Sequence, residues 1–538
     1  MTAPATDQGR MPAGLLPAQR AGVARFGVTC RHLVVAGSFL FILPNALIAT
    51  AFAPVMAAVV MLGCAGSLLV VARASGGDVL DRRVEITTLV LCGLAALALC
   101  VFGGEGHFFF PNYDWLNRDA VLADLVRQGF PPSYDYQGST FILRAPLAMY
   151  MLPAAVGRLL GLYAAHLALL AQNATLLGLM LALLAALAPR RKAVFLAVFV
   201  TFSGVEVVAQ FLKAGLAAAA GEGLAWPLRA HQHLAWWNPA FQYTNHIVQI
   251  FWVPNHAFPG WWLAVLSVLH VRREIGSGAL IVAFAFGMLW SPLTMVGALP
   301  IVGYLVLRRD FAHLLSLRTL VPCGVALCFL PIVAYLDADA ATVPYIVEIL
   351  KPGFWTVYVI FVFIQLPQAG VVAAYWRQLD DGSRTLAALA IGLLLLLPMY
   401  RLGANNDLAM RASILPLALL AFVFSSIVVD LQWRDGLGRI VAIAVILGLG
   451  MVSPAMEIQR ALMLGTFAIS DCNVLTVWHQ TEPDTWFANY LARADRIPSW
   501  LIRRDDAAPP MTIEDRNCWP QHPYHIMPMT VWRVPENW

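Results

Sequence analysis

Residues 167–187 read LALLAQNATLLGLMLALLAAL, a stretch of 21 residues without one ionisable side chain. A helix of about 20 apolar residues is long enough to cross the hydrocarbon core of a bilayer. Comparable apolar runs occupy residues 34–54, 86–101 and 440–451. The stretch therefore predicts one membrane-spanning helix among several in the same chain.

The composition agrees with a membrane protein. Of the 538 residues, 60% are hydrophobic and 12% are charged, against roughly 25% charged in a soluble domain. We expect an all-α polytopic fold with about thirteen transmembrane helices, short interfacial helices in the first large outward loop and a small outward C-terminal segment. These spans are predicted at residues 32–52, 54–73, 86–104, 164–188, 193–212, 258–272, 277–291, 293–307, 319–336, 354–376, 384–400, 412–430 and 437–453.

Basic residues gather in every second loop, which predicts the orientation of the chain. Cytoplasmic loops carry an excess of Lys and Arg, so we place the basic tail 1–31, expected to be disordered, in the cytoplasm of a bacterium. The spans at 32–453 then form a bundle in the inner membrane, and the segment 454–538 is periplasmic. No long basic run exists, so no nucleic-acid partner is expected. The outward loops are residues 104–163, 213–257, 337–353 and 401–411.

The first outward loop holds the most unusual polar sequence, GEGHFFFPNYDWLNRDAVLADLVRQGFPPSYDYQGSTFILR at residues 104–144. Helical spacing of apolar residues predicts an amphipathic helix at about 116–128 on the membrane surface, and a second interfacial helix at 146–160. Asp114 precedes the first helix and Asp119 lies in its first turns. A carboxylate beside hydrocarbon is costly and suggests a function. Alternatively, one aspartate caps the helix and the other pairs with Arg118.

Loops 213–257 and 401–411 carry further candidate binding residues. Aromatic and amide side chains suit the faces and hydroxyls of sugars, and arginines bind phosphate in planar bidentate contacts. Arg401 and Arg411 are predicted to hold a phosphate, unless Arg411 pairs with Asp407 four residues earlier. The predicted sugar-binding or acceptor-binding residues are Tyr113, Trp115, Asn245, His246, Asn255, His256, Asn406 and Asp407.

Two other interpretations of loop 213–257 remain open. Its aromatic residues suit an interfacial belt, and its HxH pair, His231 and His233, suggests zinc. No carboxylate or cysteine lies at a helical spacing that would complete a metal site, so no metal is predicted.

Eight cysteines divide into two groups by position. Six lie in or beside predicted spans and are expected to act as small apolar side chains. The remaining two, Cys472 and Cys518, lie in the outward tail. An oxidising compartment would allow them to form a disulfide.

The layout of loops and spans resembles the GT-C superfamily of integral-membrane glycosyltransferases. The resemblance rests on the segment Tyr113–Asp119, on the following residues Arg144–Tyr150 and on the order of spans and loops. It implies a polyprenyl-phosphate sugar as donor, a glycan or lipid as acceptor and an aspartate of the first outward loop as base. Two spans precede those that flank this loop, where the superfamily usually has one, and an adjacent acidic pair is absent.

The expected chemistry needs a carboxylate to take the proton of an acceptor hydroxyl and positive groups to stabilise the phosphate that leaves. Asp114 is the first choice for the base and Asp119 the second. With arginines at the phosphate, neither a metal nor another cofactor is expected. The alternative is a transporter or flippase of lipid-linked sugars or other polar lipids, for which Glu206, Gln249 and Gln365 are the candidates within spans.

Overall fold

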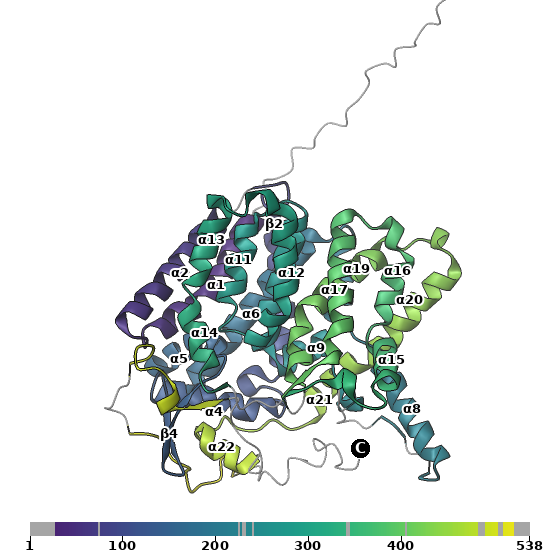
Figure 1. Ribbon diagram of the computed structural model, residues 1–538. Helices are drawn as coiled ribbons and strands as arrows, with labels where there is room; N and C mark the ends of the chain where they lie inside the picture. Colours follow the sequence, from purple (N-terminus) through teal and green to yellow (C-terminus); the bar gives the residue numbers. More distant parts are fainter. Residues whose placement is uncertain are drawn as a thin grey trace, which may run out of the picture.

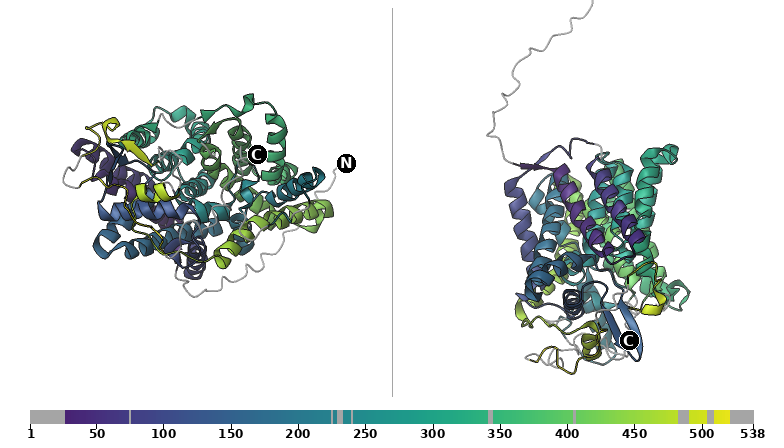
Figure 2. Two further views of the ribbon diagram at one scale, coloured as in Figure 1. Left: turned by 90° about the horizontal axis from the view of Figure 1, so that it is seen from below. Right: turned by 90° about the vertical axis from the view of Figure 1, so that its left-hand side faces the viewer.

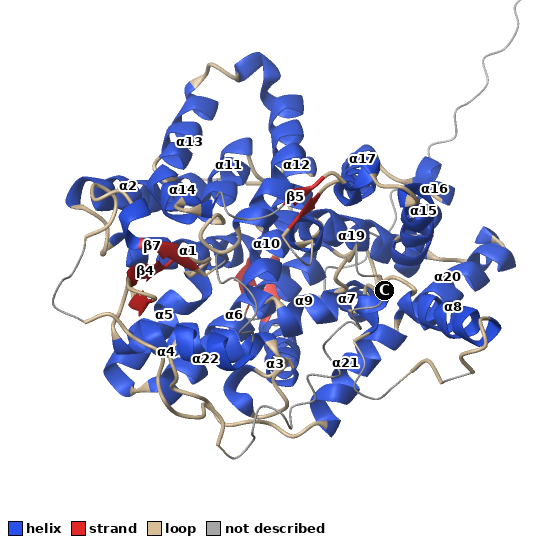
Figure 3. Cartoon of the chain, turned by 60° about the horizontal axis from the view of Figure 1, so that its bottom comes forward, coloured by secondary structure: helices blue, strands red, loops and turns tan. Residues whose placement is uncertain are grey.

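The fold is almost entirely helical. The computed structural model describes residues 27–73, 76–223, 226–228, 233–238, 241–340, 345–403, 406–481, 490–503 and 509–520. It is 70% helix and 5% strand, and the few strands are short pieces among the helices (Figure 3). This composition is that of an all-α membrane protein.

The helices begin and end close to the predicted apolar runs. In the first half of the chain they are α1 Cys30–Ala49, α2 Pro54–Ala72, α3 Ile86–Phe102, α4 Asp114–Arg127, α5 Ala148–Leu160, α6 Leu162–Leu187, α7 Lys192–Val200, α8 Glu206–Ala219, α9 His246–Trp252, α10 Pro254–Val271 and α11 Ser277–Phe286. In the second half they are α12 Pro292–Asp310, α13 Leu317–Leu327, α14 Leu330–Asp337, α15 Phe354–Gln365, α16 Pro367–Ala374, α17 Asp381–Leu396, α18 Asp407–Ala412, α19 Ile414–Asp430, α20 Leu437–Gly450, α21 Val452–Met463 and α22 Val474–Thr481.

In the described part of the chain, three small antiparallel sheets join loops at the two ends of the bundle. One pairs β1 Gly27–Thr29 with β2 Arg83–Glu85, and another pairs β5 Tyr345–Ile346 with β6 Arg401–Leu402. The third has the order β3–β4–β7 and brings the tail onto the first large loop. Its strands are β3 Ser133–Tyr136, β4 Ser139–Leu143 and β7 Leu491–Arg493.

The two ends of the bundle differ in what covers them. The β1–β2 ladder lies at the top of Figure 1, whereas α4, β4 and α22 lie together at the bottom. The side view in Figure 2 shows the long helices running between these two ends. The first outward loop and the C-terminal tail therefore share one end of the molecule, as the sequence predicts.

Among the residues that the structure describes, six helices are long and apolar enough to cross a membrane, or up to eight if each bent pair of helices counts as one span. The thirteen predicted spans are not confirmed. Helices α13 and α14 meet at a bend of 40°, and α15 and α16 at a bend of 66°. Pro331 and Pro367 open the second helix of each pair, where a residue without a backbone N–H is tolerated.

The predicted span 193–212 is interrupted. Helix α7 ends at Val200 and α8 begins at Glu206, and the non-helical residues between them contact the α15–α16 break. The Val205 amide donates to the Ile364 carbonyl at 2.7 Å, and Gln368 donates to the Ser203 carbonyl at 2.6 Å. A Cβ on Gly204 would lie 2.9 Å from the Gln365 Cα, so a glycine permits this close approach.

Helix α4 differs from the predicted surface helix. It begins at Asp114, earlier than expected, and most of it is buried between α5 on one side and α22 on the other, rather than exposing a polar face. Helix α5 packs against α6, α4 and α1. With 13 residues it is about 20 Å long and too short to cross a bilayer.

The boundary predicted at residue 454 is also displaced. Helix α21 continues from α20 to Met463 and packs against α8 and α9. Its charged residues Glu457 and Arg460 are buried against these helices. Because charged residues ended the apolar pattern, the sequence predicted the tail to start about ten residues too early.

Candidate functional site

The start of α4 is anchored to the neighbouring helices by side chains that precede or open it. Asn112 accepts a hydrogen bond from the Asp114 amide at 3.1 Å and donates to the Phe251 carbonyl at 2.7 Å. The Trp115 indole donates to the carbonyls of Gly103 and Phe251, at 2.9 and 3.2 Å. Trp115 is fully buried. It therefore holds α4 in place and offers no face to a sugar, contrary to its predicted role.

Asp114 is the more accessible of the two candidate aspartates. Its side chain remains 39% exposed, and its Oδ2 lies 3.3 Å from Arg118 Nη2. Arg118 itself is buried, with its guanidinium 5.3 Å from the centre of the Trp115 ring. Among the residues that the structure describes, Arg118 Nη1 has no hydrogen-bond partner. The pair thus combines a partly exposed carboxylate with a buried guanidinium.

Charged side chains from other segments of the chain affect the pKa of Asp114. Burial raises the pKa of its carboxyl above the usual value, while the positive charges of Arg118, Arg411 and His233 lower it and Asp407 raises it. Because more than a third of the side chain is exposed, water screens part of this shift. The charges of Arg118 and Arg411 also reach His256. The charge of Arg411, on α18, thus acts on side chains of both α4 and α10.

The two predicted phosphate-binding arginines have different surroundings. Arg411 Nη1 lies 2.7 Å from Asp407 Oδ1, the alternative pair that helical spacing indicated. Arg401 Nε lies 2.9 Å from Glu348 Oε1, and Lys351 binds the same carboxylate at 2.9 Å. The sequence did not predict the Arg401–Glu348 pair. Arg411 is the better candidate for a phosphate, because its charge reaches Asp114.

Asn245 and His246 have structural roles rather than the predicted binding roles. Asn245 caps α9 by accepting from the Val248 amide at 2.9 Å, and donates to the Ser453 hydroxyl at 3.0 Å. His246 is buried beside aromatic rings, and its Nδ1 is 2.6 Å from the Phe199 carbonyl. Neither side chain is open to a sugar.

The other predicted binding residues lie in the loop before α4 and at the starts of α10 and α18, and of these Asn255, His256 and Asn406 are also buried. Asn255 and His256 open α10, and His256 Nδ1 is 2.8 Å from the Ser291 hydroxyl. Asn406 caps α18 by accepting from the Ala409 amide at 3.3 Å. The Tyr113 hydroxyl donates to the Thr481 carbonyl of α22 at 3.2 Å and links the loop to the tail.

Asp119 belongs to a separate, buried group of side chains that the sequence analysis did not connect. Its Oδ2 lies 2.9 Å from His107 Nε2, and its Oδ1 lies 3.9 Å from His166 Nδ1. Burial lowers the pKa of His107, but the charge of Asp119 raises it and the net direction is upward. His107 follows one predicted span and His166 opens the next. Both histidines therefore lie at the same end of two neighbouring helices, as Asp119 does. This shared position in the sequence could have predicted that the three side chains lie close together.

A second buried network lies between α9, α21 and the loop before them. Glu457 accepts from His233 Nδ1 at 2.7 Å and from the Trp252 indole at 2.9 Å, and it pairs with Arg460. His233 is therefore bound to a carboxylate on another helix. The other histidine of the HxH pair, His231, lies outside the described residues.

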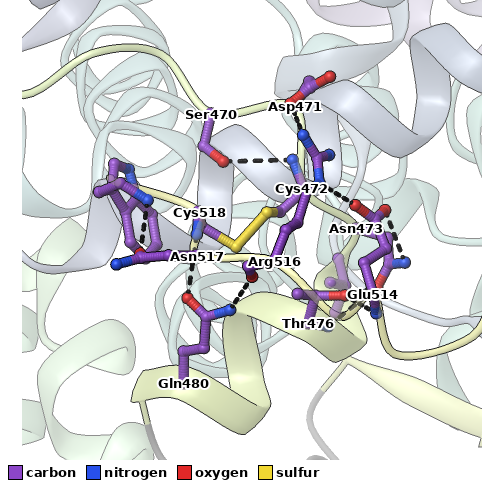
Figure 4. Close-up of a disulfide and its surroundings, with 12 residues drawn as sticks. Ser470, Asp471, Cys472, Asn473, Thr476, Gln480, Glu514, Arg516, Asn517 and Cys518 are labelled. Atoms are coloured by element: carbon purple, nitrogen blue, oxygen red, sulfur yellow. Dashed lines mark hydrogen bonds and ion pairs between the residues drawn. A yellow bond between two sulfur atoms is a disulfide. The ribbon is translucent and has the colours of Figure 1, made fainter. Parts of the chain in front are cut away.

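The tail is held over this end of the bundle by a disulfide. Cys472 and Cys518 are joined with a Cα–Cα distance of 5.8 Å, the pairing that the sequence predicts (Figure 4). Arg516 pairs with Asp471 and Glu514 around it. Asp124 of α4 accepts from the Tyr134 hydroxyl at 2.7 Å and from the Val474 amide at 2.9 Å. The tail is thus cross-linked internally by the disulfide and is also hydrogen-bonded to α4.

A cavity of ≈ 380 Å³ lies at the far end of the bundle, where α17 begins and α19 ends. Arg190, Arg272 and Asp380 are among its lining residues. None of the predicted site residues lines it, so we assign the candidate site from the arrangement of side chains around Asp114.

No protein-family model, curated protein or solved structure matches this chain.

Proposed function

We propose that the protein is a membrane glycosyltransferase that moves a sugar from a polyprenyl-phosphate donor to a glycan or lipid acceptor on the outer side of the bacterial inner membrane. The observation that carries the proposal is the partly exposed Asp114 beside the buried Arg118, with the charge of Arg411 reaching the same carboxylate. The apolar helices beneath this site supply the hydrophobic surroundings that a prenyl chain requires.

Asp114 takes the role of base in this mechanism. Its carboxylate accepts the proton of the acceptor hydroxyl, and the acceptor oxygen attacks the anomeric carbon of the sugar. The bond between that carbon and the phosphate oxygen breaks, and the prenyl phosphate leaves with the electron pair. A base aligned in this way contributes about 10²–10⁴ in rate.

The arginines stabilise the phosphate as it leaves. Arg118 is buried beside Asp114 and contributes its positive charge to the place where the phosphate would lie. Arg411 adds a second guanidinium, although it must share its donors with Asp407. Fixed positive groups placed where negative charge develops are worth more in a site that excludes water than in bulk solvent.

The substitution Asp114→Asn tests the base. It keeps the shape of the side chain and removes the proton acceptor, so turnover should fall by at least about 10² while binding of a prenyl-phosphate sugar persists. The matched control is Asp135→Asn, at an exposed aspartate on β3 at the same end of the molecule. Binding and product formation are scored separately in reconstituted protein. Full turnover in Asp114→Asn would remove it as the base.

The proposal includes the orientation of the chain. We propose a cytoplasmic N-terminus and a periplasmic tail, because the basic loops lie at the end opposite α4 and α22. Cysteines introduced at the exposed positions Asp135 and Asp381 test this with a thiol reagent that does not cross membranes. Labelling from outside at 381 and not at 135 would reverse the orientation and exclude the proposed site from the periplasm.

One observation favours a transporter as the second candidate. Two helix breaks, α7–α8 and α15–α16, contact one another, and the buried Glu206 accepts from Gln365 at 3.4 Å beside them. Transporters often place substrate sites at such broken helices. Movement of a lipid-linked sugar across vesicles, lost in Glu206→Gln and unaccompanied by any glycoside product, would favour this function over transfer.

A further inference from the structure

We propose that His107, Asp119 and His166 form a structural metal site that holds Zn²⁺. The three side chains come from different elements: His107 from the 3-10 turn Glu105–His107, Asp119 from α4 and His166 from α6. One ligand atom of each lies within 4.8 Å of the others. Two imidazole nitrogens and a carboxylate oxygen are ligands that zinc accepts.

The hydrogen bond on the far side of His107 orients the ring toward the site. His107 Nδ1 is 2.9 Å from the Phe467 carbonyl. A carbonyl can only accept, so Nδ1 carries the proton and a neutral ring turns the lone pair of Nε2 toward Asp119. Such a contact between the second nitrogen and a backbone carbonyl is usual for histidines that bind metals.

With that proton assigned, the short contact between His107 and Asp119 needs a positive charge. Nε2 and Oδ2 are 2.9 Å apart, and both are acceptors when the ring is neutral. Either a second proton on His107 or a cation between the two atoms removes the repulsion. A second proton on His107 would remove the repulsion between His107 and Asp119 but would leave His166 without a partner in the described part of the chain.

His166 distinguishes the two possibilities. Its side chain is 1% exposed, and neither ring nitrogen has a hydrogen-bond partner among the described residues. A buried polar group without a partner is rare. Its Nδ1 faces Asp119 Oδ1 at 3.9 Å, too long for a hydrogen bond. A cation bound by all three side chains satisfies His166 as well as the His107–Asp119 pair.

The distances suit a tetrahedral ion. With bonds of about 2.0–2.1 Å, two ligands of a tetrahedral zinc ion lie about 3.3 Å apart. The separation of His107 Nε2 from Asp119 Oδ2 is 2.9 Å and that of His166 Nδ1 from Asp119 Oδ1 is 3.9 Å, values on either side of this one. The ligand atoms of all three side chains lie within 4.8 Å of one another, so a modest inward movement of the side chains would bring them around one ion. A water molecule would occupy the fourth position.

The position of the site indicates a structural rather than a catalytic metal. The side chains of His107 and Asp119 are 6% and 1% exposed, so no substrate can reach the ion. The site would tie the start of α4 to α6 and, through the Phe467 carbonyl, to the tail. Thr466 reinforces that link by donating to the His107 carbonyl at 3.0 Å. The inference does not rest on the proposed transferase activity.

Metal analysis of the full-length protein tests the site. The chain is purified in detergent without a polyhistidine tag, washed with a weak chelator and analysed for all transition metals. We expect about one zinc ion per chain, because the ligand side chains are buried and come together only in the folded chain. His166→Gln and Asp119→Asn should each retain less than about a tenth of it. The matched control is His270→Gln, at a histidine of α10 that is also buried and that contacts the Leu305 carbonyl.

A second measurement uses the unmodified protein and therefore does not depend on how the variants fold. Zinc added after removal of metal by a strong chelator should raise the midpoint of thermal unfolding, because a ligand bound only by the folded state stabilises it. Cobalt in place of zinc should show the visible absorption of a tetrahedral site. Unmodified protein that neither retains zinc nor shifts its midpoint would overturn the proposal. Equal zinc in the wild-type protein and both variants would mark adventitious binding and overturn it too.

Discussion

Asp114 and Asp119 lie five residues apart on the same helix, yet their surroundings are opposite. Asp114 is 39% exposed and lies beside Arg118, whereas Asp119 is 1% exposed and lies between two histidines. A helix turns about 100° per residue, so five residues place the two side chains about 140° apart. Asp114 is partly exposed to solvent, whereas Asp119 faces His166 of α6. Two carboxylates of one short sequence can therefore have very different exposure and partners, which is why we propose a chemical role for Asp114 and a structural role for Asp119.

The largest expected effect is a difference in stability between two matched variants. Asp119→Asn removes one partner of a buried pair and should cost about 3–5 kcal/mol. Asp114→Asn removes a partly exposed pair with Arg118 and should cost less than about 1 kcal/mol. Thermal unfolding of both variants in the same detergent measures the difference. Equal midpoints would show that the two aspartates do not have separate roles.

The disulfide of the tail should have the next largest effect. Closing a loop between Cys472 and Cys518 is worth roughly 3–4 kcal/mol by loop-closure estimates. Replacing both cysteines with serine should therefore lower the thermal midpoint and loosen the tail over α4. Cys323→Ser, at a free cysteine, is the control. If a reductant leaves the midpoint of the unmodified protein unchanged, the tail is held by its other contacts alone.

Substitution of Arg411 should have a smaller effect, which falls on donor binding and not on stability. Arg411→Gln should weaken binding of a prenyl-phosphate sugar by about 1.5–3 kcal/mol, the range for a hydrogen bond to a charged group. Lysine at this position should restore binding only in part, since it lacks the planar fork. Arg401→Gln should affect the thermal midpoint more than donor binding, because Arg401 pairs with the buried Glu348. If Arg401→Gln and Arg411→Gln weaken donor binding equally, Arg401 also binds the donor phosphate.

The smallest expected effect is a dependence of stability on pH that arises from Asp124. Burial raises the pKa of this carboxyl to about 7, against the opposing hydrogen bonds from Val474 and Tyr134. The folded state therefore holds the proton more tightly than the unfolded chain. Stability from this group is complete at low pH and is lost as the pH rises through about 7.

The variant Asp124→Asn isolates that effect. From about pH 6 to about pH 8 the wild-type protein should lose roughly 1 kcal/mol more than the variant, whose side chain does not titrate. Thermal midpoints of both proteins across this range measure the difference. Parallel curves would show that Asp124 does not take up a proton in the folded state.

Local patterns in the sequence predicted those features that depend on neighbours along the chain. Apolar runs marked most of the helices, and helical spacing indicated the Arg411–Asp407 pair. The two tail cysteines were identified because every other cysteine lies in or beside an apolar run. The sequence could not show that α4 is buried, because its polar side chains are satisfied by α22 and the tail rather than by water.

The sequence by itself determined that this is a helical membrane protein and that Asp114, Asp119 and Arg411 belong to polar loops at the ends of apolar helices. Only the tertiary structure decided which aspartate is reachable, and that His107 and His166 meet Asp119. The physical reason is that a hydrophobic run specifies burial in lipid or protein without specifying a neighbour. Contacts between elements far apart in the sequence depend on how helices pack, and no local pattern records that packing.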